Sequence, residues 1–179
     1  MVSVRERVTP HPEGLGRGGR ARSGCGATQR YATRVKTQAT ITRIVMPGQT
    51  NRHGSLFGGV ALSLMDEAAA IVAHRVANGP VVTAHIASVD FKAPIWHGWA
   101  VEVTARLRMV GRTSMRIEVD TYGECLDTGE RSHSTTAEFV MVAIDENGRP
   151  RELSDESRAV LSSANRAKEE AESADAGES

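Results

Sequence analysis

The sequence has little of what marks a secreted or membrane-bound protein. It contains two cysteines in 179 residues, Cys25 and Cys125, and so few favour a reduced, cytoplasmic protein over a disulfide-bonded one. No apolar run reaches the roughly 18 residues that a membrane-spanning helix needs. The formal net charge is zero, so composition gives no electrostatic reason to expect nucleic acid or a membrane surface as a partner. We therefore expect a cytoplasmic protein with neither partner.

Short motifs for metals, nucleotides and serine nucleophiles are missing as well. The six histidines are not arranged as H-E-x-x-H, and no C-x-x-C pair occurs. The glycines form neither a G-x-G-x-x-G fingerprint nor a Walker motif. Ser55 and Ser63 do not stand in a G-x-S-x-G elbow. We therefore expect no metal site, and the candidate chemistry has to come from carboxylates, amides and the backbone.

Charge and composition divide the chain into three segments. Residues 1–38 carry eight basic and two acidic side chains and many glycines, which predicts a disordered basic extension. A nucleic-acid-binding arm or a transit peptide is the alternative, but Glu6, Glu13 and the glycines argue against an amphipathic helix. Residues 154–179 predict a polar acidic tail, partly helical from Asp155 to about Glu172, with too few apolar residues for a core face. The folded unit is predicted at 39–153.

The apolar periodicity of this unit predicts a β-α-β-β-β-β order. Residues 60–77 contain neither glycine nor proline and are apolar almost all round, which indicates a buried helix that ends at Asn78-Gly79-Pro80. Strands are predicted at 39–45, 81–91, 101–109, 115–120 and 135–143, three of them with alternating apolar and polar residues. One helix and one antiparallel sheet are satisfied if the sheet curves around the helix, giving an α+β fold. Its exposed sheet edges favour pairing between two copies.

Asp66 is the most informative single residue. It lies on the predicted helix among Leu62, Ser63, Ala69 and Ala70, and a carboxylate in such surroundings is costly unless it has a partner. A catalytic carboxylate is one interpretation. The other is a helix carboxylate that points to solvent, as Glu67 would.

The start of this helix and two loops supply further candidates. Gly58 and Gly59 would let a ligand approach free backbone N–H groups at the positive end of the helix, although a tight turn also explains them. Asn51 lies in the preceding loop and, taken alone, is an ordinary loop asparagine. The loop after the strand at 101–109 carries Arg112, Thr113 and Ser114, which either form a hairpin turn or bind phosphate groups.

Several motifs in register change the weight of these candidates. In order along the chain they are Met46-Pro-Gly-Gln-Thr-Asn-Arg-His-Gly-Ser-Leu-Phe-Gly-Gly59, Met65-Asp-Glu-Ala-Ala69, Val81-Val-Thr-Ala84, Val89-Asp-Phe-Lys-Ala-Pro94, Gly111-Arg-Thr-Ser-Met115 and Val142-Ala-Ile-Asp-Glu-Asn-Gly-Arg-Pro150. Together they cover about 39–153 and resemble the YciA-type acyl-CoA thioesterases, also called the brain acyl-CoA hydrolase family.

The resemblance implies a single hotdog domain, in which a curved antiparallel sheet wraps a long helix, and hydrolysis of acyl-CoA. It places the catalytic aspartate on Asp66, the catalytic asparagine on Asn51 and the glycine pair on Gly58 and Gly59. It also implies a homodimer, and a hexamer built as a trimer of dimers, with Asn51 and Asp66 meeting from different subunits. The sequence departs from the family at Trp99, where many members have aspartate, and at Phe57, where some have histidine, so Phe57 receives no proton-transfer role.

The expected mechanism follows from these assignments. The helix start polarises the thioester carbonyl, and Asp66 activates a water or attacks the carbonyl itself. Coenzyme A is part of the substrate, and no cofactor is expected. Two alternatives remain at this stage: a hotdog dehydratase or hydratase of acyl thioesters, for which no histidine is suitably placed, and a non-catalytic acyl-CoA-binding protein.

Overall fold

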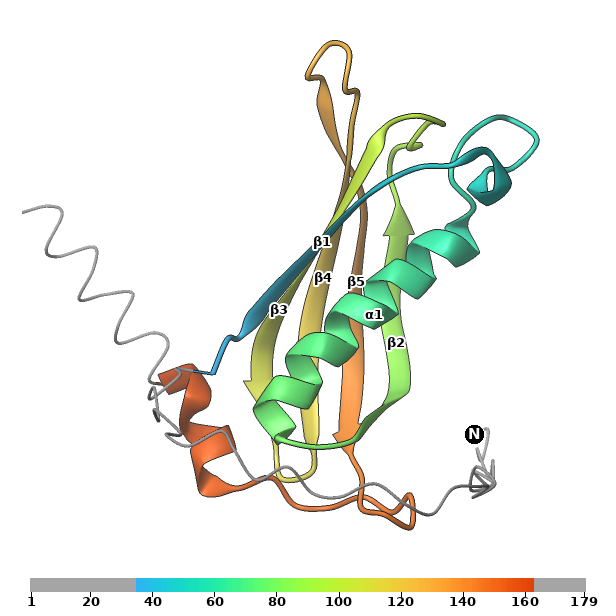
Figure 1. The fold of residues 1–179 in the computed structure, drawn as a ribbon. Helices are drawn as coiled ribbons and strands as arrows, with labels where there is room; N and C mark the ends of the chain where they lie inside the picture. Colours follow the sequence, from blue (N-terminus) through green and yellow to red (C-terminus); the bar gives the residue numbers. More distant parts are fainter. Residues whose placement is uncertain (1–34, 163–179) are drawn as a thin grey trace, which may run out of the picture. The chain divides into compact units, whose positions relative to one another are not determined.

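Five strands form one antiparallel sheet, and one long helix lies across its inner face (Figure 1). The computed structural model describes residues 35–162. The elements are β1 (Gln38–Ile44), the 3-10 turn η1 (Pro47–Gln49), the helix α1 (Gly58–Ala77), β2 (Val81–Phe91), β3 (Ala100–Val110), β4 (Ser114–Glu124) and β5 (Arg131–Ala143). The strand order is β1-β3-β4-β5-β2. The predicted α+β class, element order and sheet around a helix are confirmed.

The helix begins and ends at the residues that the sequence singled out. α1 starts at Gly58, so that the glycine pair forms its first turn, as the sequence predicts. At the other end Asn78 takes a left-handed conformation, with φ 48°. A residue with this backbone conformation cannot continue a right-handed helix, and asparagine tolerates the conformation better than most residues.

The core lies between α1 and the inner face of the sheet. Nine of the 20 residues of α1 are buried, and burial alternates along the central strand β4, where Met115, Ile117 and Val119 point inward. Burying each such side chain stabilises the fold by about 1.5–3 kcal/mol. On the side of α1 away from the sheet, Ser63 and Glu67 are exposed in the single chain.

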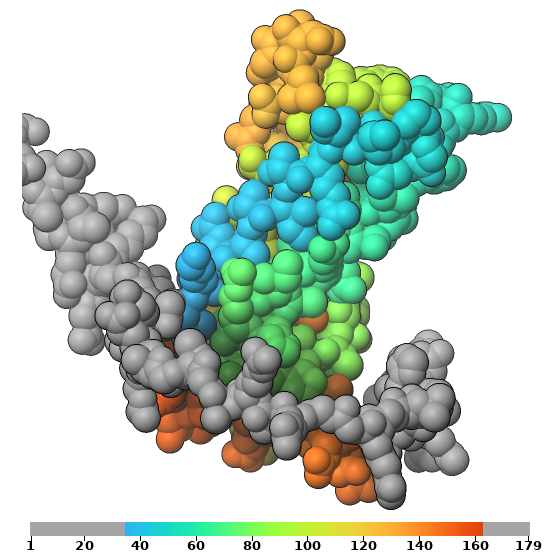
Figure 2. Space-filling view, viewed as in Figure 1, coloured from blue at the N-terminus to red at the C-terminus, as the bar shows by residue number. Residues whose placement is uncertain are grey.

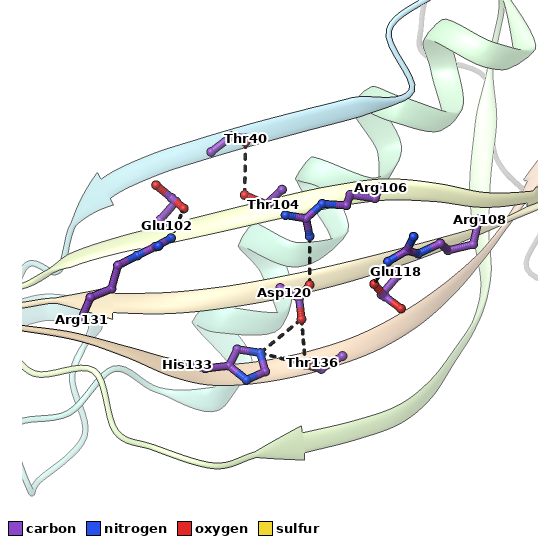
Figure 3. A network of polar contacts seen from close by, with 10 residues as sticks. All are labelled: Thr40, Glu102, Thr104, Arg106, Arg108, Glu118, Asp120, Arg131, His133 and Thr136. Carbon is purple, nitrogen blue, oxygen red and sulfur yellow. Dashed lines mark hydrogen bonds and ion pairs between the residues drawn. The ribbon is translucent and has the colours of Figure 1, made fainter. Parts of the chain in front are cut away.

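The outer face of the sheet is covered by ion pairs between neighbouring strands (Figure 3). Arg106 of β3 lies 3.0 Å from Asp120 of β4, and the other carboxylate oxygen of Asp120 accepts a hydrogen bond from Thr136 of β5 at 2.9 Å. Glu102 pairs with Arg131, and Arg108 with Glu118. Cross-strand pairs of opposite charge each contribute a fraction of a kcal/mol to stability. The charged side chains keep this face of the sheet polar, and their charges largely balance.

The two edges of the sheet differ. Along β1, Arg75 of α1 donates to the carbonyl of Gln38 at 3.3 Å, and Arg43 pairs with Glu67 of α1 at 3.1 Å. The other edge is β2, and no strand within residues 35–162 pairs with its outer side. Most of the residues along the first half of β2, such as Val82 and His85, are exposed. β2 is therefore the edge that remains available for pairing with another chain.

The beginning of the predicted tail packs on the core, which corrects the expectation of a wholly solvated segment. Residues 155–162 are helical, and Leu153, Ser157 and Val160 are buried. Ser157 and Val160 are three positions apart and lie on one face of this short helix, whereas Leu153 precedes it. Residues 1–34 of the predicted extension and residues 163–179 of the tail lie outside the described residues.

The described part of the chain contains no helix that is both long and apolar enough to cross a membrane.

Candidate functional site

The start of α1 has free hydrogen-bond donors. The first bond of the helix runs from the N–H of Ala61 to the carbonyl of Phe57 at 3.0 Å, and no side chain caps the helix. No group within residues 35–162 accepts from the N–H groups of Gly58, Gly59 or Val60. These donors lie at the positive end of the helix dipole, which attracts anions and developing negative charge.

The two glycines play different parts at this helix start. A Cβ atom on Gly58 would lie 3.2 Å from Cζ of Phe91, because the Phe91 ring packs against the first turn. A Cβ atom on Gly59 would meet nothing within 4 Å. Gly58 therefore allows a close contact inside the protein, whereas Gly59 leaves open space in front of the backbone donors.

A cavity of about 250 Å³ adjoins this turn. It lies between the first residues of α1, the end of β2 and the segment that follows β2, and its walls include Ser55, Gly58, Phe91, Lys92 and Thr135. Phe91 thus forms a wall of the cavity and also contacts the helix start. A small group can enter here and reach the N-terminal turn of α1 from the side.

Asp66 has a partner on the sheet. The hydroxyl of Thr83 in β2 donates a hydrogen bond to Oδ1 of Asp66. The Thr83 hydroxyl also lies 3.4 Å from the sulfur of Met141, so its position is fixed from two sides. Asp66 is half-buried and makes no ion pair with any described residue. Glu67 is exposed and paired with Arg43. The carboxylate of Asp66 is therefore oriented by Thr83, with Oδ2 free to accept a proton.

Asn51 organises its own loop in the single chain. Its side-chain oxygen accepts from the backbone N–H of His53 at 2.8 Å and of Ser55 at 3.3 Å, and its amide donates to the Ser55 hydroxyl at 2.9 Å. This is the ordinary turn-forming role of a loop asparagine. The amide carries two hydrogens and uses one here, so one donor remains for another ligand.

The single chain does not bring the three predicted features together. Asp66 follows the glycine pair by seven or eight residues, which is about 10–12 Å along a helix that rises 1.5 Å per residue. None of the hydrogen bonds within residues 35–162 joins Asn51 to Asp66. One chain therefore holds two separate groups of candidate residues: the helix start with its cavity and the Asn51 loop, and the Asp66–Thr83 pair.

Arg112, Thr113 and Ser114 lie at the opposite end of α1 from Gly58 and Gly59. The guanidinium of Arg112 pairs with Glu152 at 2.6 Å, and the backbone carbonyl of Arg112 accepts a hydrogen bond from the N–H of Leu153. The neighbouring Arg151 contacts the last residue of α1, Ala77. In this chain the segment forms a hairpin turn between β3 and β4, and Arg112 already has a carboxylate partner. Binding of substrate by these three residues stays a prediction.

Sequence reasoning gave Thr83 no role, and Phe91 likewise. Thr83 meets Asp66 across 17 positions of sequence, and that contact depends on how the helix lies over the sheet, which periodicity does not fix. Phe91 closes the predicted strand and carried no signal beyond its size. Within residues 35–162 no group of three or more histidine, cysteine, aspartate or glutamate side chains is placed to hold a metal ion.

Comparison with known proteins relates the chain to thioesterases. A family model described as the thioesterase superfamily matches residues 53–129. An acyl-CoA thioester hydrolase of Zymomonas mobilis, itself uncharacterized, is 41% identical over 113 residues, which is 63% of this chain and 76% of that protein. The acyl-CoA thioester hydrolase YciA of Escherichia coli is 36% identical over 116 residues, covering 63% of this chain and 88% of the relative.

A solved structure gives the same relationship. The crystal structure of an apo-hexameric acyl-CoA thioesterase matches with a TM-score of 0.64 and 38% sequence identity, over 78% of this chain and 94% of that one. The two chains therefore share the same fold over most of their length.

Proposed function

The chain belongs to the thioesterase superfamily, among the acyl-CoA thioester hydrolases related to YciA, and we propose that it hydrolyses acyl-CoA to a free fatty acid and coenzyme A with Asp66 and Asn51 at the reacting centre. The observation that carries the proposal is the uncapped start of α1 beside a cavity, because it offers backbone donors where a thioester carbonyl would gain negative charge. The remaining half of the chemistry is the carboxylate held by Thr83.

The proposed reaction uses both groups of residues, the helix start with the Asn51 loop and the Asp66–Thr83 pair. The thioester carbonyl lies at the N–H groups of Gly58 and Gly59. A water attacks the carbonyl carbon and gives its proton to Oδ2 of Asp66, while the oxyanion is stabilised by the helix start. The C–S bond then breaks, the thiolate of coenzyme A takes up a proton, and the acid leaves. Asn51 orients the water or the oxyanion with its free amide hydrogen. Direct attack by Asp66 through an anhydride gives the same products.

A complete site in this proposal needs two chains. Asp66 contacts Thr83 in the first half of β2, whereas Gly58 contacts Phe91 at its end. If two β2 edges pair antiparallel about a two-fold axis near Ala87, Thr83 of one chain lies opposite Phe91 of the other. Asp66 of one subunit then faces the helix start and Asn51 loop of its partner. Pairing also covers the exposed edge of β2.

Subunit mixing tests the shared site. Asn51→Ala and Asp66→Ala are each expected to be nearly inactive as separate proteins. After co-expression or refolding of an equal mixture, half of the dimers contain one chain of each kind. Each mixed dimer has one site with both residues intact, so activity recovers to about a quarter of the parental value by symmetry. If subunit exchange is verified and no activity returns, each chain builds its own site.

Assembly and substrate follow the relatives in this proposal. The solved relative is hexameric, and we propose the homodimer as the unit of a hexamer arranged as a trimer of dimers. The substrate is acyl-CoA, and the mechanism above requires no cofactor. The cytoplasmic location inferred from composition stays a prediction.

A thiol-trapping assay over a panel of acyl-CoA chain lengths tests the activity itself. The expected result is release of coenzyme A by the parent protein and loss of that release in Asp66→Asn. Water addition to an enoyl-CoA without thiol release would identify a hydratase instead. Binding of acyl-CoA without any turnover would identify a non-catalytic binding protein. The panel also measures the chain-length preference, which the residues of the site do not specify.

A further inference from the structure

Two segments that meet at the start of α1 contain no carboxylate. Residues 41–65 and residues 91–101 lack aspartate and glutamate altogether. They are joined by hydrogen bonds from the N–H of His97 to the carbonyl of Gly54 at 2.9 Å, and from Leu56 to Ile95 at 2.8 Å. Figure 2 shows the first segment, in cyan to teal, beside the yellow-green of the second. The two segments themselves therefore have no negative side chain, and the nearest strand to bring one is β4, whose Glu124 pairs in register with Ala100.

The same two segments carry exposed basic side chains without acidic partners. We call the four of them the basic rim: Arg52, His53, Lys92 and His97, all exposed. Within residues 35–162 no carboxylate lies at ion-pair distance from Arg52 or Lys92. Asp90 is close in sequence to Lys92, but it pairs in register with Thr136, which faces the outer side of the sheet. Lys92 follows the end of β2, and no ion pair joins it to Asp90.

This lack of partners contrasts with the rest of the described chain. Elsewhere in residues 35–162, seven of ten arginines pair with carboxylates, whereas Arg75, Arg149 and Arg151 do not. The ion pairs are Arg43–Glu67, Arg106–Asp120, Arg108–Glu118, Arg112–Glu152, Arg116–Glu138, Arg131–Glu102 and Arg158–Asp155. Figure 3 shows three of these pairs on the outer sheet face. Of the two such cations on the basic rim, Lys92 lines the cavity, and Arg52 lies three residues before Ser55, which also lines it.

The positive charges of the basic rim and the positive end of the helix dipole lie close together, so their electrostatic potentials add. Lys92 and Ser55 both line the cavity, Gly58 forms part of its wall, and Arg52 precedes Ser55 by three residues. The first turn of α1 contains no acidic residue to offset the dipole. Unpaired cations around a concave site concentrate anions there, and neighbouring carboxylates would cancel the effect.

We propose that the basic rim binds the phosphate groups of coenzyme A and directs the thioester into the adjacent cavity. The inference rests on the proposed thioesterase function and adds the residues that recognise the nucleotide end of the substrate. Lys92 stands at the cavity, while Arg52 lies farther out on the loop that carries Asn51, so the two cations are placed along the path of the pantetheine arm. Arg112 differs from both, because a phosphate would have to replace Glu152 as its partner.

The test compares a substrate with phosphates to one without. The variant is Arg52→Ala with Lys92→Ala, and the matched control is Lys36→Ala with Arg149→Ala, which removes two exposed cations that also lack carboxylate partners. Both control residues lie toward the other end of α1: Gln38, near Lys36, contacts Arg75 in the last turn, and Ile144, near Arg149, bonds to Pro80. Each protein is assayed with an acyl-CoA and with the pantetheine thioester of the same acid.

The rim variant is expected to raise KM for acyl-CoA about tenfold or more with little change in kcat, since a contact remote from the thioester binds the ground and transition states alike. The difference should shrink at high salt. KM for the pantetheine thioester should stay at the parental value, and Arg52→Lys with Lys92→Arg should restore most of the affinity for acyl-CoA. The control pair should leave both substrates unaffected.

Two outcomes would overturn the proposal. Equal losses with both substrates would mean that the substitutions disturb the Asn51 loop rather than phosphate binding. Unchanged KM for acyl-CoA in a rim variant that turns over normally would show that the phosphates bind elsewhere, while hydrolysis stands. Calorimetry with coenzyme A separates the remaining case. If the parent binds coenzyme A, the rim variant binds it at least tenfold more weakly and no acyl-CoA is hydrolysed, the rim is correct and the thioesterase proposal is wrong.

Discussion

The two ends of α1 are built in opposite ways. At the last turn, the carbonyl of His74 accepts from Asn78 and Gly79, Ala77 accepts from Arg151 at 2.6 Å, and Val76 accepts from Ser157 at 2.7 Å. At the first turn, three N–H groups have no partner within residues 35–162, and no side chain caps them. One end of the helix is satisfied by protein groups, and the other is left with free donors next to a cavity that Gly58 helps to line.

Charge follows the same division. The closed end has cations close to the carbonyls, namely Arg75 in the last turn and Arg151 from the segment after β5. These complement the negative end of the dipole. The open end lacks the acidic residues that would stabilise it in the same way. The comparison indicates that the closed end fixes the helix in the fold, whereas stability is forgone at the open end, where an anionic transition state would bind.

The largest effect is expected between these ends, at Asp66. Asp66→Asn removes the proton acceptor but keeps an oxygen that can accept from Thr83. We expect kcat to fall by roughly 100- to 10,000-fold, which is the usual contribution of a general base, with an unchanged melting temperature. Steady-state kinetics on the folded variant measure this. Near-parental turnover by folded Asp66→Asn would place the base elsewhere.

The next effect concerns the open end itself. Gly59→Val adds a side chain where a Cβ meets nothing within 4 Å, so it obstructs the approach of a carbonyl without a clash inside the chain. Loss of one oxyanion interaction costs about 3 kcal/mol in the transition state, a little over 100-fold in kcat. His74→Val at the closed end is the control, and it should leave kcat unchanged. If both variants lose activity alike, the effect reflects valine in a helix and not the open end.

Breaking the closed end should affect stability and leave the chemistry intact. Arg151→Ala removes the donor to Ala77 and a second bond to the carbonyl of Ile144, and we expect a loss of about 2 kcal/mol in the free energy of unfolding. Denaturant titration gives this value, with the exposed Arg149→Ala as the comparison. Turnover per folded molecule should match the parent. A variant that is fully stable yet slow would show that the closed end takes part in catalysis.

The smallest effect is expected at Arg112, which the sequence analysis assigned to substrate binding. Its guanidinium is exposed and paired with exposed Glu152, and surface pairs contribute up to about 1 kcal/mol. We expect Arg112→Ala to raise KM for acyl-CoA by no more than a few-fold, with kcat unchanged. Glu152→Ala, which frees Arg112, should lower KM slightly if the guanidinium binds phosphate. If neither variant changes KM, Arg112 has no part in binding.

The helix and most of the strands were predictable because each produces a recognisable pattern of apolar residues over a short stretch of the sequence. The alternation in β3, β4 and β5, the unbroken run of α1 and the stop at Asn78 all arise from periods of two or about 3.6 residues that burial on one face imposes. The start of the tail was not predicted correctly. Ser157 and Val160 are too few to stand out in the sequence, and their burial depends on contacts with the rest of the fold, such as the bond from the Ser157 hydroxyl to the carbonyl of Val76 in α1.

By itself, the sequence determined the helix with its glycine pair and its half-buried carboxylate at Asp66, and the absence of acidic residues in the segments around the helix start. These properties are carried by residues close together along the chain. The tertiary structure alone decided that Thr83 holds Asp66, that Phe91 packs on Gly58 and that Arg112 lies at the far end of the helix. Each of these contacts joins segments whose meeting depends on how α1 crosses the sheet, and side-chain packing over the whole core sets that crossing.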